Sequence, residues 1–284
     1  MNKVLLLSAF SLVVFFSSCG DEEVDITPPS MKIISLSPAP VSAEICGTAE
    51  DTVFLLRGGE NLSFELLFRD ESSLSQYKID IHNNFDCHGH GGGAAPGISI
   101  PNVNNQTTDW SELEITGLSG QEQQVAQTLV APENITAGNY HFQIQVIDEA
   151  GNDNPLANFY SIQAVNPNDE EPPAISVNAP AGTSLSIAKG EVITFEGEVT
   201  DNYSLSEGGN GVLFLSYTDL SSGNSFVTDA VFPFDNSASK SYPFSFSYTI
   251  PGTLKAGSYR FFLRAHDGVR NVAEAVAFEV GITD

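Results

Sequence analysis

The chain has 284 residues, of which 41% are hydrophobic, so it is long enough to bury one large core or two smaller ones. Eleven Lys and Arg residues stand against 36 Asp and Glu residues, which gives a formal net charge of −25. This charge repels phosphate backbones and anionic lipid surfaces, so we expect no nucleic-acid partner. The 24 Gly, 15 Pro and 19 Phe residues, with no long stretch of helical periodicity, predict an all-β chain with many turns.

The N-terminal segment, residues 1–18, has the pattern of a secretion signal. Lys3 supplies a positive charge, and the apolar stretch from Val4 to Phe16 is too short to span a bilayer comfortably. Two serines precede Cys19, and small residues before a cysteine resemble the site cut by the bacterial lipoprotein signal peptidase. We therefore expect a lipoprotein signal peptide that is removed and leaves Cys19 as the lipidated first residue.

The segment that follows, residues 19–29, is an acidic and proline-containing tether. Asp21, Glu22 and Glu23 resemble the acidic export signal of Bacteroidota lipoproteins that reach the outer face of the outer membrane. We therefore expect the protein to be held at the outer membrane by the lipid on Cys19 alone and to face the cell exterior.

An internal repeat divides the rest of the chain. Seven residues recur 131 positions later, namely Gly59, Glu60, Phe64, Asp70, Ser73, Leu74 and Ser75. Six more recur 119 positions later, namely Ala137, Gly138, Tyr140, Phe142, Asp148 and Asn152. Residues 166–173 contain three prolines and no apolar side chain, which predicts a stiff, solvated linker. The expected domains are residues 30–165 and 174–284.

Short segments with apolar residues at every second position indicate strands with one buried face, as in residues 61–70, 77–82 and 138–148. Each repeat has about seven such segments, with a Tyr early in a late strand and an Asp-turn-Asn after it, a pattern that resembles the immunoglobulin fold. We expect an all-β protein with two tandem immunoglobulin-like β-sandwiches after the lipoprotein signal peptide.

The distance between matching residues of the two repeats is 131 positions up to Leu74 but only 119 positions from Gly138 on. The first domain therefore has 12 more residues than the second between Leu74 and Gly138. The surplus lies where histidines cluster. His82 ends the strand over residues 77–82, and His141 begins the strand over residues 138–148; both alternate away from the buried face. These strands are antiparallel neighbours in an immunoglobulin-like sheet, so the two side chains are expected to meet.

His88 and His90 follow on a Gly-rich loop that leaves the same end of the strand. Three or four converging imidazoles favour zinc or copper, so we predict a metal site formed by these two residues with His82 and His141. Asp80 and Asp86 are candidate oxygen ligands or acceptors for the imidazole N–H groups. The alternative is a polar loop with one incidental outward histidine on each strand.

If Cys19 is lipidated, two cysteines remain, Cys46 and Cys87. An even number of cysteines in an oxidising compartment makes a disulfide the default expectation. The connection that holds Cys46 reaches the same end of an immunoglobulin-like sandwich as the histidine loop. We therefore favour a Cys46–Cys87 disulfide, with Cys87 as a thiolate metal ligand as the alternative.

Two further hypotheses concern acidic loops and catalysis. Asp70, Asp148 and Asp153 of the first domain, and Asp201 and Asp267 of the second, are expected in loops at the same end of each sandwich. At the domain junction the linker residues Asp169, Glu170 and Glu171 approach Asp201 and Asp267. Calcium is the less favoured interpretation of these acidic loops, because Asp at strand ends commonly caps turns. We expect no enzyme: the sequence contains no nucleophile elbow or zinc-protease helix. Only Asp80, Asp86 and Glu60 are candidate general bases. His266 is expected to have no ligand role.

Three stretches of the first domain, Ile81–Asp86, His88-Gly89-His90 and Ala137–Asn152, resemble a family of Bacteroidota surface lipoproteins with an immunoglobulin-like domain of unknown function. The resemblance covers residues 30–165 and the lipid signal; the second domain is similar to generic immunoglobulin-like or cadherin-like modules. It implies the architecture and the site location but no activity.

Our functional hypothesis is a surface-anchored lipoprotein that binds zinc or copper, beside an outer-membrane transporter that takes up the metal. The alternative is an adhesion or glycan-binding protein in which Trp110 and exposed Tyr and Phe residues form the binding face.

Overall fold

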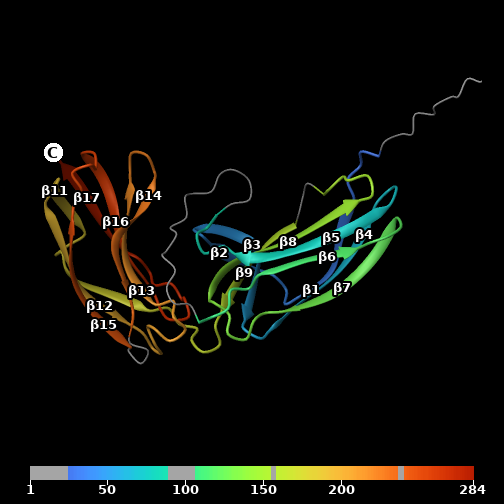
Figure 1. Cartoon of the computed structure of the whole chain (residues 1–284), viewed down its shortest axis with the longest axis horizontal. Coiled ribbons are helices and arrows are strands. Elements are labelled where there is room, and N and C mark those ends of the chain that lie inside the picture. The colour runs from blue at the N-terminus through green and yellow to red at the C-terminus, as the bar shows by residue number, and fades with distance from the viewer. Residues whose placement is uncertain (1–24, 89–105, 155–157, 236–239) are drawn as a thin grey trace, which may run out of the picture.

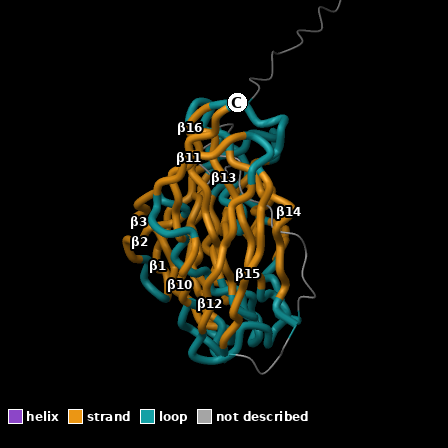
Figure 2. The backbone as a smooth tube through the Cα atoms, turned by 90° about the vertical axis from the view of Figure 1, so that its left-hand side faces the viewer, coloured by secondary structure: helices purple, strands orange, loops and turns teal. Residues whose placement is uncertain are grey.

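A computed structural model describes residues 25–88, 106–154, 158–235 and 240–284. The expected signal peptide, Cys19 and His90 lie outside these ranges. Within them every regular element is a β-strand (Figures 1 and 2), and no helix is long and apolar enough to cross a membrane.

The first domain is a sandwich of two sheets. Its strands are β1 (Ser30–Ser37), β2 (Val41–Ile45), β3 (Thr48–Arg57), β4 (Asn61–Arg69), β5 (Leu74–Asn83), β6 (Glu112–Gly117), β7 (Glu122–Val130), β8 (Gly138–Asp148) and β9 (Asn158–Val165). One sheet has the order β1-β4-β7 and the other β2-β3-β9-β8-β5-β6. Alternate residues of β4 and β8, among them Phe64 and Phe142, fill the space between the sheets and are fully buried.

The second domain repeats this arrangement. Its strands are β10 (Ala174–Ala179), β11 (Ser184–Ala188), β12 (Val192–Thr200), β13 (Val212–Asp219), β14 (Ser225–Pro233), β15 (Ser241–Thr249), β16 (Gly257–His266) and β17 (Val276–Thr283). They form the sheets β10-β12-β15 and β11-β17-β16-β13-β14 around a separate core.

Both domains contain the tyrosine corner of immunoglobulin-like sandwiches. The Tyr140 hydroxyl donates to the Thr136 carbonyl at 2.7 Å, and the Tyr259 hydroxyl donates to the Lys255 carbonyl at 2.9 Å. The two tandem immunoglobulin-like sandwiches predicted from the sequence are confirmed.

The first domain differs from the second by two insertions. The surplus predicted from the repeat lies between β5 and β6, where the second domain joins β13 to β14 by a short turn. A second insertion was not predicted. The start of β10 lies 144 positions after the start of β1, whereas Gly190 lies 131 positions after Gly59. The first domain therefore has 13 more residues than the second between its first strand and this glycine. These residues build β2 and the start of β3.

A disulfide between Cys46 and Cys87 joins the two insertions, with Cα atoms 5.7 Å apart. Cys46 lies in the turn between β2 and β3, and Cys87 follows β5 in the histidine segment. The amide groups of Asn84 and Asn139 contact the Cys46 sulfur at 3.9 and 3.8 Å. Cys87 is therefore bonded to sulfur in this structure, and the histidine segment is tied to the β2–β3 hairpin.

The two domains are in direct contact, since the Ala137 amide donates to the Val269 carbonyl at 2.9 Å, and the linker that the sequence predicts to be solvated is so only in part. Asn166 is 0% exposed and Asp169 is 3% exposed. Asn166 donates through its side-chain amide to the Ile135 carbonyl of the first domain at 2.6 Å. The prolines and acids of the linker suggested solvation, but long-range packing of the loops around it buries part of the segment.

The disulfide predicts the outcome of a thiol titration. The unfolded chain, produced from residue 20 onward so that Cys19 is absent, should show no reactive thiol before reduction and two after it, because Cys46 and Cys87 are paired. Two reactive thiols without reductant would contradict the pairing.

Candidate metal centre

The pairing of β5 with β8 places two histidines side by side. The strands are antiparallel, and the register sets His82 opposite His141, as the alternation in the sequence predicts. Their ring centroids are 5.3 Å apart. Ile81 and Phe142, the adjacent residues in the two strands, are buried in the core, so the histidines lie on the opposite face of the sheet.

His88 joins this pair from the segment after β5. Its ring centroid lies 5.6 Å from that of His82 and 5.0 Å from that of His141. One ring nitrogen from each of the three histidines lies within 4.8 Å of the others. The structure thus brings together three of the four predicted ligands; His90 lies outside the described residues.

Two carboxylates orient these imidazoles. Nδ1 of His82 donates to Asp80 at 2.8 Å, and Nδ1 of His88 donates to Asp86 at 2.6 Å. The hydrogen bond with His88 lowers the pKa of Asp86. With the proton on Nδ1, the lone pair of each ring lies on Nε2, which is the arrangement found around metal-binding histidines.

The candidate general bases already have structural contacts. Asp80 and Asp86 hydrogen-bond the histidines, and the Glu60 carboxylate accepts a hydrogen bond from the Arg57 amide at 2.8 Å. The three imidazoles, two of them oriented by carboxylates, are an arrangement suited to holding a metal ion.

The second domain lacks this arrangement. At the corresponding place Thr218 pairs with Arg260, whose guanidinium forms an ion pair with Glu279. His266 is 5% exposed and packs edge-on against Phe214. Burial lowers the pKa of His266 well below its usual value, and it belongs to no group of converging ligands among the described residues.

The aromatic face expected for glycan binding does not include Trp110. This side chain is 3% exposed and belongs to the core of the first domain. The hydrophobic packing of the sandwich, which the local sequence around Trp110 does not reveal, takes it away from the surface.

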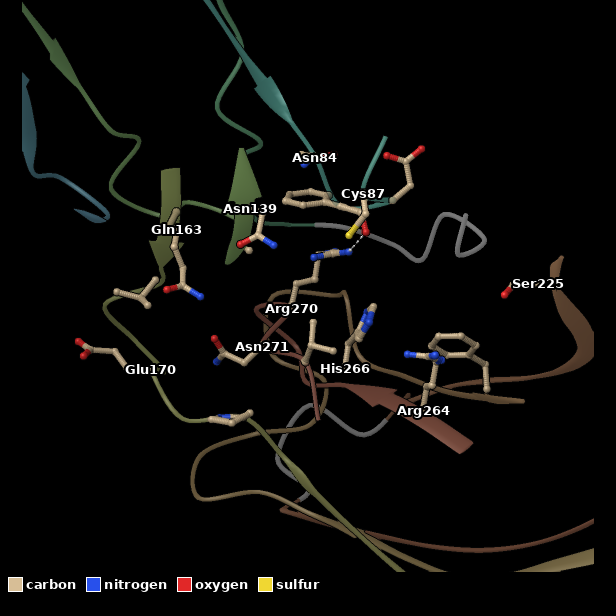
Figure 3. A pocket seen from close by; sticks show the side chains of 18 residues that line it. Asn84, Cys87, Asn139, Gln163, Glu170, Ser225, Arg264, His266, Arg270 and Asn271 are labelled. Atoms are coloured by element: carbon tan, nitrogen blue, oxygen red, sulfur yellow. Dashed lines mark hydrogen bonds between the residues drawn. The ribbon is translucent and has the colours of Figure 1, made fainter. Parts of the chain in front are cut away.

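A cavity of about 550 Å³ lies beside the histidine segment, between the domains, and sequence reasoning missed it. Figure 3 shows Arg270 reaching from the second domain toward the segment that contains Cys87. Its guanidinium lies 3.8 Å from the centre of the Phe85 ring and donates to the Phe85 carbonyl at 3.3 Å. Burial lowers the pKa of Arg270 to about 10.

Comparison of the two repeats could have pointed to Arg270 as a structurally important residue. The 119-residue displacement aligns Arg270 with Gly151, and both have positive φ, 82° and 90° respectively. A left-handed conformation favours glycine, so an arginine at this place indicates that its side chain has a structural role.

Comparisons with solved structures find similar folds at low identity. The fibronectin(III)-like modules of CbhA from Clostridium thermocellum are 9% identical, with 89% of this chain and 94% of that chain covered and a TM-score of 0.31. The sialic acid binding region of a Streptococcus sanguinis SK1 adhesin is 14% identical, with 91% and 78% covered and a TM-score of 0.24. A tetra-tandem repeat from the extending region of a large adhesion protein is 13% identical, with 90% and 49% covered and a TM-score of 0.27. Similarities at this level carry no argument about function.

Comparison with protein families gives a clearer result, although no curated protein matches the chain. The model of a domain of unknown function, DUF4625, matches residues 17–163, which is just over half of the chain and includes all three converging histidines. The chain belongs to the DUF4625 family.

Proposed function

We propose that the protein binds a transition metal ion, zinc or copper, through His82, His88 and His141. The observation that carries the proposal is the convergence of one ring nitrogen from each histidine within 4.8 Å. Nitrogen ligands of this kind suit zinc and copper, whereas calcium requires oxygen ligands. His90, two positions after His88, is a further candidate ligand from the sequence.

The surroundings of the three histidines support binding in two ways. Asp80 and Asp86 hold the rings of His82 and His88 and keep Nε2 as the ligand atom. The Cys46–Cys87 disulfide restrains the chain one residue before His88. A ligand that is already restrained loses less conformational entropy when the metal binds.

In this proposal the metal is captured at the cell surface. Lipidation of Cys19 would hold the protein at the outer membrane, and an outer-membrane transporter would receive the metal. The acidic residues that follow Cys19 support export to the outer face.

The second candidate function is adhesion or glycan binding. It is favoured by exposed apolar side chains on β6, an edge strand of its sheet, where Leu113 is 67% and Ile115 is 58% exposed. This surface would contact a partner without using the histidines, so metal-binding measurements separate the two candidates.

Calorimetric titration of zinc into the chain produced from residue 20 onward tests the metal site. The parent should bind zinc, and His88→Ala or His141→Ala should each abolish most of the affinity because each removes a ligand. Asp80→Asn and Asp86→Asn should have the smaller effect of about 10- to 100-fold that is typical of residues orienting a ligand.

Arg260→Ala is the matched control, because Arg260 occupies the place of His141 in the second domain and should leave zinc affinity unchanged. Zinc binding of equal strength by the parent, His88→Ala and His141→Ala would eliminate the proposed site and leave adhesion as the remaining candidate. Circular dichroism should show the same β-rich spectrum for all variants, since the second domain folds without these histidines.

The anchor is tested in cells. Cys19→Ala should move the protein out of the membrane fraction or leave an uncleaved precursor, because the lipid is the proposed membrane contact. Replacing Asp21, Glu22 and Glu23 with Ala should leave the protein anchored but protected from external protease. Unchanged membrane retention of Cys19→Ala would contradict the lipoprotein assignment.

A further inference from the structure

Three carboxylates meet where the linker enters the second domain. Asp169 comes from the linker, Asp201 follows β12, and Asp267 follows β16. One oxygen from each lies within 4.8 Å of one oxygen from the others. Asp169 is 3% exposed and Asp267 is 0% exposed, so the cluster is largely removed from water. We call it the junction cluster.

Turn capping accounts for only part of this cluster. Oδ1 of Asp201 accepts a hydrogen bond from the Tyr203 amide at 2.7 Å, and Oδ1 of Asp267 accepts from the Val269 and Asn271 amides. The Oδ2 atoms of Asp169 and Asp201, in contrast, are buried and have no hydrogen-bond partner. A buried carboxylate oxygen without a partner is costly, so these atoms point to a missing ligand.

The electrostatics of the cluster are also incomplete. Among the described residues, none of the three carboxylates forms an ion pair with Lys, Arg or His. Burial, together with the nearby charge of Asp201, raises the pKa of Asp169 to about 6. Burial is also the main cause that raises the pKa of Asp267 to about 7. A bound cation would relieve this repulsion.

The first domain contains the same constellation. Asp25, Asp70 and Asp148 converge with oxygens within 4.8 Å, and Asp70 also has a buried Oδ2 without a hydrogen-bond partner. In each domain an asparagine amide ties the last carboxylate to the entering chain: Asn152 donates to Asp148 and to the Asp25 carbonyl, and Asn271 donates to Asp267 and to the Asp169 carbonyl. The repeat has therefore kept these positions together.

We propose that the junction cluster of Asp169, Asp201 and Asp267 is a calcium site. The available side-chain ligands are carboxylate oxygens, which favour a hard cation over zinc or copper. Calcium accepts a variable number of carboxylate and carbonyl oxygens in irregular geometry, whereas magnesium requires a near-ideal octahedron. This site is separate from the histidines and does not depend on the function proposed for them.

Calcium at this place would order the contact between the domains. The turn that follows Asp267 touches the first domain directly, since the Val269 carbonyl accepts a hydrogen bond from the Ala137 amide at 2.9 Å. Arg270, in the same turn, packs on Phe85. A cation that ties Asp267 to the linker at Asp169 would therefore hold this turn, and with it the relative position of the two sandwiches.

The test is a calorimetric titration of calcium chloride into the chain produced from residue 20 onward. Thermal unfolding of the same chain is measured with calcium and with chelator. Asp201→Asn should lower affinity at the junction by on the order of tenfold or more, because it removes one charged ligand. In chelator the Asp201→Asn variant should unfold at a higher temperature than the parent, because it lacks one of three crowded charges. Calcium should raise its unfolding temperature less than it raises that of the parent. Asp169→Asn provides a second variant of the same kind.

Asp70→Asn is the matched control, since it lies at the equivalent place in the first domain and should leave the junction binding event intact. Three results would overturn the proposal: no calcium binding at millimolar concentration, the same calcium affinity and stoichiometry in Asp201→Asn as in the parent, or magnesium binding at least as tightly as calcium. Zinc binding by the histidines is measured separately, so failure of one proposal does not decide the other.

Discussion

The antiparallel pairing of β5 with β8 is the constraint on which the candidate site depends. Side chains in a strand alternate between faces, so the burial of Ile81 and Phe142 determines that His82 and His141 lie on the other face. A slip of one residue would place the histidines in the core and the apolar residues outside. The packing of the sandwich therefore positions the candidate metal ligands, because the register that buries Ile81 and Phe142 also brings His82 and His141 together on the outer face.

The rest of the site comes from two insertions that the second domain lacks. The segment after β5 brings His88 to the pair, and the β2–β3 hairpin supplies Cys46, which holds that segment through Cys87. The repeated sandwich itself needs neither insertion, as the second domain shows. The protein thus combines a duplicated scaffold with a candidate metal site added to one copy, whereas the acidic clusters belong to the scaffold and occur in both copies.

The sequence predicted those features that depend on local alternation and on comparison of the repeats. It predicted the strands around His82 and His141, their pairing and the position of the histidine insertion. It did not predict the β2–β3 hairpin, because the residues that recur between the repeats begin at Gly59, after this hairpin, and the alternation of Val41, Ala43 and Ile45 spans only five residues. The burial of Asp169 and Trp110 was also missed, since it results from contacts with segments distant in sequence.

Nitrogen NMR of the imidazoles, with and without zinc, tests the central claim most directly. Because Nδ1 of His82 and of His88 donates to a carboxylate, zinc should bind through Nε2 and shift the Nε2 resonances of these residues and one ring nitrogen of His141 together, with saturation at the same zinc concentration. Resonances of the three histidines that remain unchanged when zinc is in excess, or that saturate at different zinc concentrations, would contradict a single shared site.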